Sequence, residues 1–102
     1  MAGQVGWTPD GRFPPDFAGQ FRQTLENTLA VLAEAGAGPE HIVRMTWYVV
    51  DLDEYRAALS DIGPIYRDII GRNYPAMAVV GVTGLVEPTA KLEIETTAVI
   101  PD

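Results

Sequence analysis

Few side chains in this sequence of 102 residues have the chemistry of a catalytic or metal-binding group. Because cysteine is absent, thiolate catalysis, disulfides and cysteine-ligated metals are excluded. His41 is the only histidine, and its place at the entrance to a predicted strand favours a capping or surface role. Ser60 and the threonines have no neighbouring base for a hydrolase triad. Without a second histidine or a recognisable carboxylate spacing, neither a metal site nor a cofactor is predicted.

The last predicted strand, residues 91–100, carries acidic side chains. Alternation places Glu93 and Glu95 on one face with Lys91, whereas the opposite face is largely apolar. Taken alone, this pattern is typical of structural glutamates on a solvated face, paired with Lys91 or with another subunit.

A long amphipathic helix is predicted after the prolines at positions 14 and 15. Asp16 suits the positive end of the helix dipole, and Gly36 and Gly38 favour its termination. A turn at residues 8–11 precedes it. The apolar stripe that predicts this helix has spacings of three and four residues and consists of Phe17, Phe21, Leu25, Leu29 and Leu32.

Three strands and a second helical region are predicted downstream. Residues 42–50 and 76–83 are rich in β-branched and apolar types, and residues 91–100 alternate more cleanly. Between the first two of these strands, apolar residues at helical spacing begin after Asp51, which is expected to cap the helix. We expect Gly63 and Pro64 to break this region into two short pieces, because proline removes a backbone donor.

The strand at residues 42–50 has no clear solvent face. Strict alternation groups Ile42, Arg44, Thr46, Tyr48 and Val50 on one face, and Val43, Met45, Trp47 and Val49 on the other. Two helical regions can cover only one face of a sheet of three or four strands. Apolar residues such as Trp47, Val80 and Val82 would then be left open to water, which normally marks an interface. We therefore expect a homo-oligomer.

Composition indicates one globular domain spanning residues 1–102. The hydrophobic fraction of 47% and the charged fraction of 21% are ordinary for a folded domain. A net charge of -7 without any basic run disfavours nucleic-acid binding. No signal-peptide pattern begins the chain and no apolar run is long enough to span a membrane, so cytoplasm is the expected location and no membrane partner is predicted.

Several strings along the chain resemble the RidA family, also called YjgF and, in older usage, endoribonuclease L-PSP. Their order and spacing from residue 2 to the end carry the resemblance. The strings are Ala2-Gly3-Gln4, the Gln-x-Arg-Gln-x-Leu-x-Asn pattern at residues 20–27, Ala35-Gly36, residues 46–52, Tyr74-Pro75-Ala76 and residues 92–98.

The resemblance implies a chorismate-mutase-like α+β fold, in which two helical regions pack on one face of the sheet. It implies a homotrimer whose sheets form a central barrel, with small-molecule pockets at the subunit interfaces. It also implies an activity, the hydrolysis of reactive enamines and imines such as 2-aminoacrylate to a keto acid and ammonia. No cofactor is implied.

The resemblance also identifies candidate site residues. Glu93 takes the place of the glutamate that positions or activates water, and Gly3 that of a glycine whose amide contacts ligand carboxylates. The alternative for Gly3 is a turn or bulge glycine. Ala76 and Met77 would line the ligand pocket. Met77 stands where deaminating members have an arginine, and it cannot form a bidentate charged pair with a substrate carboxylate; its alternative is core packing.

A second departure concerns the β-hairpin that usually precedes the Ala2-Gly3-Gln4 string in this family. It is largely absent from the numbered chain. We expect either a gene start assigned too late or a naturally short protein with an altered sheet edge.

Three functions remain open. A deaminase acting on C–N bonds would lose its turnover on Glu93→Ala. A non-catalytic trimer that binds a metabolite or a protein partner is favoured by Met77 and by the missing hairpin. RNA binding, with Arg44, Trp47 and Tyr48 as a stacking platform, is disfavoured by the acidic charge.

Overall fold

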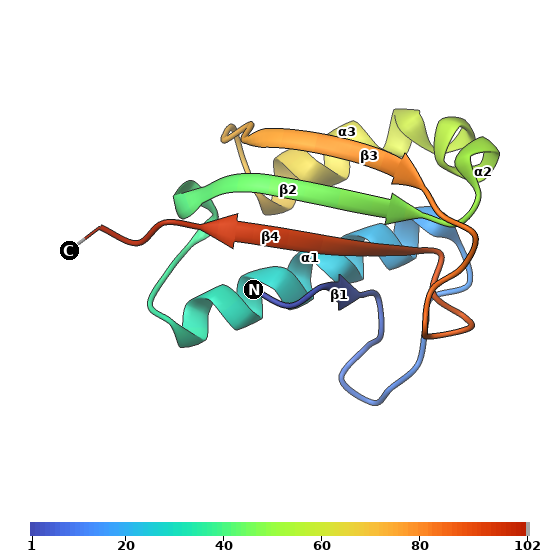
Figure 1. Ribbon diagram of the computed structural model, residues 1–102, viewed down its shortest axis with the longest axis horizontal. Helices are drawn as coiled ribbons and strands as arrows, with labels where there is room; N and C mark the ends of the chain where they lie inside the picture. The colour runs from blue at the N-terminus through green and yellow to red at the C-terminus, as the bar shows by residue number, and fades with distance from the viewer. Residues whose placement is uncertain (102) are drawn as a thin grey trace.

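The computed structural model describes residues 1–101 and consists of a four-stranded sheet with the α-helices packed behind it (Figure 1). The strand order is β1-β4-β2-β3; β2 and β3 run parallel, and the other neighbours are antiparallel. This is the predicted α+β arrangement. In chain order the elements are β1 Gln4–Val5, α1 Phe17–Glu34, a 3₁₀ turn Pro39–His41, β2 Ile42–Val49, α2 Leu52–Ala57, α3 Leu59–Ile69, β3 Ala76–Gly81 and β4 Leu92–Ala98.

The predicted stripe of α1 is the face that packs on the sheet. Phe17, Phe21, Leu25 and Leu32 are buried, and Leu29 is partly buried against the same core. Thr24 and Thr28 are buried on this face because each hydroxyl donates to the carbonyl four residues earlier, at 2.7 and 2.9 Å. The helix ends at Glu34, and two residues later Gly36 has a φ of 74°, a left-handed conformation that glycine adopts without strain.

Strand β2 contains a bulge that the alternation rule could not predict. Ile42 pairs with Ala98 of β4 and Arg44 pairs with Thr97, so Val43 is an extra residue between them. The bulge moves Ile42 onto the buried face with Met45 and leaves Val43 45% exposed. The predicted grouping of Ile42 with Arg44 and of Val43 with Met45 is therefore wrong.

The break in the second helical region lies at Ala58, not at Gly63 and Pro64. Pro64 lies inside α3, and Ala58 both ends α2 and precedes α3. The amide that proline lacks would have bonded the carbonyl of Ser60, and Ser60 is exposed, so water can satisfy that carbonyl. Asp51 caps α2 as predicted, accepting hydrogen bonds from the amides of the second and third helical residues.

The sheet face opposite the helices is uncovered in the single chain (Figure 1). Of the residues predicted to be open there, Val80 is 39% exposed as expected, but Trp47 is only 4% exposed and packs edge-on against Phe21 of α1, with ring centroids 4.9 Å apart. Tyr48 and Val80 are cross-strand neighbours on the uncovered face. Within residues 1–101, no helix has the length and apolar character needed to cross a membrane.

Candidate functional site

Gly3 and Glu93 meet at the corner where β1 pairs with β4. Val5 is the cross-strand partner of Glu93, and Gly3 lies two residues before it on the same face. The Glu93 side chain extends over Gly3 so closely that a Cβ added there would lie 2.8 Å from the carboxylate carbon Cδ. Only glycine leaves room for this placement, so the two predicted residues are brought together.

The Glu93 carboxylate is half-buried and has no hydrogen bond or ion pair within residues 1–101. The expected alternative, pairing with Lys91, is wrong. The Lys91 ammonium instead contacts Glu54 of α2, with Nζ 2.9 and 3.1 Å from its two carboxylate oxygens. Glu93 can therefore accept a proton or a hydrogen bond from a ligand.

Asn27 of α1 holds the β1 side of this corner. Its Nδ2 donates to the carbonyls of Val5 and Trp7, both at 2.9 Å. Its Oδ1 accepts from Nε2 of Gln23 at 2.9 Å, which fixes the orientation of the amide. The motif asparagine on the helix thus ties the strand that carries Gly3 to the layer behind the sheet.

Gln20 holds the β4 side in the same way. Its side chain is 1% exposed and makes three hydrogen bonds to backbone groups. Nε2 donates to the carbonyls of Pro14 and Thr89 at 3.0 Å, and Oε1 accepts from the amide of Lys91 at 2.8 Å. Gln20 therefore holds Lys91, which lies immediately before β4 and two residues before Glu93. Gln20 and Asn27 are seven residues apart, two turns of one helix face.

Ala76 and Met77 lie on β3, which β2 separates from β4. Ala76 pairs with Arg44 and Met77 with the buried Met45, so the two side chains point to opposite faces of the sheet. Met77 is on the helix side, whereas Glu93 pairs with Tyr48 on the uncovered side. A single chain therefore does not bring Met77 next to Glu93.

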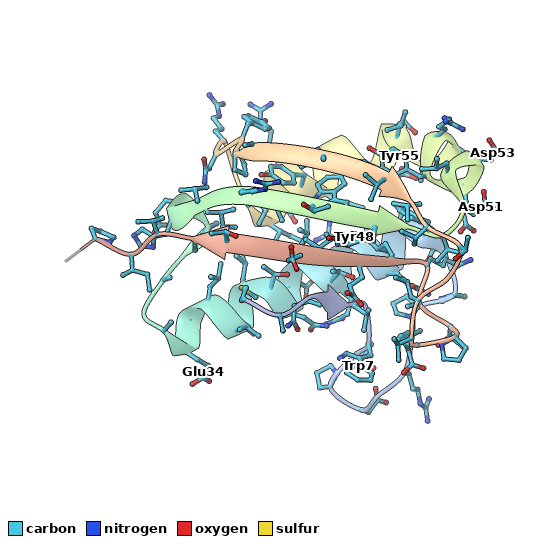
Figure 2. All side chains as sticks on the ribbon, viewed as in Figure 1. Trp7, Glu34, Tyr48, Asp51, Asp53 and Tyr55 are labelled. Carbon is cyan, nitrogen blue, oxygen red and sulfur yellow. The ribbon has the colours of Figure 1, made fainter. Side chains whose placement is uncertain are left out.

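A cavity of about 950 Å³ opens beside Met77, between β3 and helices α2 and α3. In Figure 2, Tyr48 lies over the middle of the sheet, and Tyr55 of α2 lies near β3, where this cavity is found. Aromatic and aliphatic side chains predominate in its lining, which includes Trp47, Tyr55, Leu59, Ile62, Tyr66, Tyr74 and Met77. The size falls within the range of small-molecule sites.

The phenol of Tyr66 lies in the lining of this cavity, and its surroundings shift its pKa. Burial, with a smaller contribution from the neighbouring Tyr74, raises the pKa of Tyr66 above its ordinary value of 10.0. Its hydroxyl donates to the carbonyl of Asn73 at 2.7 Å. Tyr66 therefore stays neutral at physiological pH and anchors the turn that leads into β3.

His41 has the structural role predicted from its position. Its Nδ1 accepts a hydrogen bond from the amide of Gly38 at 2.9 Å, which closes the 3₁₀ turn before β2. Within residues 1–101, no group of three or more histidines, aspartates or glutamates could hold a metal ion.

Residues 1–100 match the family described as endoribonuclease L-PSP. The chain belongs to the RidA/YjgF family. A RutC family protein of Haemophilus influenzae is 34% identical over 99 residues, which cover 96% of this chain and 75% of that protein. The 2-iminobutanoate/2-iminopropanoate deaminase of Escherichia coli is 32% identical over 99 residues, which cover 96% and 76%. The crystal structure of E. coli TdcF with bound serine superposes with a TM-score of 0.84 and 32% identity, over 99% of this chain and 79% of TdcF.

Sequence reasoning missed the cavity beside Met77 in this RidA-family chain. The helical spacing of Tyr55, Leu59, Ile62 and Tyr66 was the available signal, because it places these residues on one side of the helical region. The expected break at Gly63 and Pro64 obscured it, since a continuous α3 is what aligns Leu59 with Tyr66 along β3.

Proposed function

We propose that this RidA-family protein hydrolyses small reactive enamines or imines at a site built around Glu93 and Gly3. The observation that carries the proposal is the half-buried, unpaired Glu93 carboxylate lying over Gly3, within the described residues 1–101. The 2-iminobutanoate/2-iminopropanoate deaminase relative supports this reaction class, and TdcF with bound serine supports a small polar ligand.

The reaction requires one carboxylate to carry a proton to the nitrogen in each of two steps. Glu93 would accept a proton from water as the water oxygen bonds to the imine carbon, and the C=N bond becomes a C–N single bond. The same proton would then pass to the nitrogen, which gives a carbinolamine. Glu93 would next take the proton of the carbinol hydroxyl and deliver it to the nitrogen as the C–N bond breaks, which leaves a carbonyl and ammonia. General acid–base catalysis of this kind typically contributes about 10²–10⁴ in rate.

We further propose that the protein is a homotrimer in which a second copy completes each site. Two observations support this. The sheet face carrying Tyr48, Val80 and Glu93 is uncovered by the chain's own helices. Met77 also lines a cavity on the other side of the sheet, so it can approach Glu93 only from a neighbouring copy.

The test is ammonia release from an imine generated in solution by an amino-acid oxidase, with catalase present to remove peroxide. The intact protein should accelerate ammonia release above the buffer rate, and Glu93→Gln should lower kcat by about 100-fold. Glu95→Gln is the matched control, because Glu95 lies two residues along the same face and is exposed. If decay follows the buffer rate for every imine offered, the protein is not a deaminase.

A non-catalytic function is the second candidate, favoured by Met77. A site without the arginine cation lacks the bidentate partner that would hold a substrate carboxylate in one orientation. A trimer that binds a metabolite without converting it would be stabilised thermally by that ligand and would release no ammonia. Imine turnover above the buffer rate would exclude this alternative.

A further inference from the structure

The cavity beside Met77 is walled by aromatic rings. Tyr66 and Tyr74 stack with ring centroids 5.7 Å apart and an angle of 18° between their planes. Trp47 forms the inner wall, 6.2 Å from Tyr66 between centroids. Such rings bind planar apolar groups through their faces and edges.

The aliphatic lining comes from both sides of the cavity. Met77 reaches it from β3 and is 47% exposed, while Leu59 reaches it from α3 and is 51% exposed. A thioether makes favourable contacts with aromatic edges and adapts to the shape of its neighbour. Both exposed side chains are thus placed to contact a ligand.

Charge is confined to two neighbouring residues of α3. Asp68 is already engaged by Arg22 of α1, at 2.9 Å between Nη1 and Oδ2. Arg67, the other charged residue of the lining, has no ion-pair partner within residues 1–101. Apart from these two residues the lining is uncharged, so most of the cavity wall offers apolar contact to a ligand.

From these walls we propose that the cavity selects substrates with an aromatic or bulky aliphatic side chain. The inference rests on the proposed function and specifies its substrate class: imines and enamines larger than those derived from two- or three-carbon amino acids. A cavity of about 950 Å³ is far larger than a methyl group needs, so a small substrate would leave most of the apolar wall in contact with water.

The experiment compares two imines made in solution by the same oxidase, one from phenylalanine and one from alanine. The intact protein should hydrolyse the phenylalanine imine with a kcat/KM about tenfold or more higher, since each matched methylene in an apolar pocket is worth about 10–200-fold. Equal values, or a preference for the alanine imine, would overturn the proposal while leaving the deaminase function intact.

Leu59→Trp fills the cavity from an exposed position and should fold normally. It should lower kcat/KM for the phenylalanine imine about tenfold more than it lowers kcat/KM for the alanine imine. Val31→Trp is the matched control on α1, 40% exposed and outside the cavity, and should change neither value. An equal loss on both imines in Leu59→Trp would mean that the cavity does not select the side chain.

Product binding tests the cavity separately from catalysis. Calorimetry should give a dissociation constant for phenylpyruvate about tenfold lower than for pyruvate, and Leu59→Trp should remove the difference. If neither imine is turned over but this preference holds, the deaminase function is wrong and the cavity assignment stands. Equal binding of the two keto acids would overturn the assignment whether or not imines are hydrolysed.

Discussion

The β1–β4 corner and the cavity beside β3 are held by different kinds of interaction. At the corner, amide side chains of α1 hold the backbone of both strands, and Glu93 lies over a glycine that admits nothing larger. At the cavity, stacked rings and a methionine form the walls, and a hydrogen bond holds Tyr66 to Asn73 in the turn after α3. The first region can position a reacting group, and the second can select a side chain.

The two regions are therefore suited to different roles, and one chain alone does not bring them together. Polar contacts fix Glu93 within a narrow range of positions, which proton transfer requires. Apolar contacts accept side chains of different shapes, which is compatible with selecting a substrate by its size. Because β2 separates the two strands and the side chains face opposite sides of the sheet, the proposed site joins the corner of one copy to the cavity of the next.

The largest effect is expected from breaking the hydrogen bonds that position the corner. Gln20→Leu leaves the amide of Lys91 and the carbonyls of Pro14 and Thr89 without partners, so unfolding should require about 3 kcal/mol less free energy. Urea denaturation measures this loss. Gln4→Leu, which removes one exposed bond to Ala2, should cost less than about 1 kcal/mol. A similar cost for both variants would mean that Gln20 does not position β4.

A smaller effect should follow from adding one methyl group at the corner. Gly3→Ala forces the Glu93 side chain to move, because the new Cβ would meet its carboxylate. We expect kcat for imine hydrolysis to fall about tenfold with little change in melting temperature, which steady-state kinetics and calorimetry would show. Gly84→Ala is the control, since no heavy atom lies within 4 Å of the Cβ position there. Full activity in Gly3→Ala would separate Gly3 from the site.

Much of the helical layer could be predicted because it depends on local spacing. The stripe from Phe17 to Leu32 and the cap at Asp51 need only neighbouring residues, and both are confirmed. The alternation of β4 is also confirmed, since Leu92, Ile94 and Thr96 are buried. These patterns repeat within one element and do not require knowledge of its partner.

Other features depend on contacts between distant residues and could not be predicted. The bulge at Val43 exists because β2 must match the register of β4, about 55 residues further along the chain. Lys91 pairs with Glu54 because α2 passes beside the start of β4, not because of any local spacing. The proximity of Gly3 to Glu93 could be expected only from the family resemblance, because no periodicity connects the two ends of the chain.

The smallest effect concerns Tyr66 in the cavity lining and the pH dependence of stability. Burial raises the pKa of the Tyr66 hydroxyl in the folded state. The stability that the neutral phenol contributes is therefore fully present below the unfolded-state pKa of about 10 and is lost as the pH rises through the higher folded-state pKa. Tyr66→Phe should flatten the decline of unfolding free energy above pH 10. At pH 7 it should cost about 1 kcal/mol, because the bond to Asn73 is lost. An unchanged alkaline slope in denaturation curves would show that Tyr66 titrates normally.

Mixed oligomers test whether each site joins two copies of the chain. Glu93→Gln removes the proton carrier, and Met77→Trp blocks the mouth of the cavity; each variant alone should be nearly inactive on the phenylalanine imine. When the two are co-refolded in equal amounts, about a quarter of the interfaces combine an intact Glu93 from one chain with an intact Met77 from the other. We therefore expect about a quarter of the unmodified activity. Activity equal to the mean of the two parents would contradict the shared site.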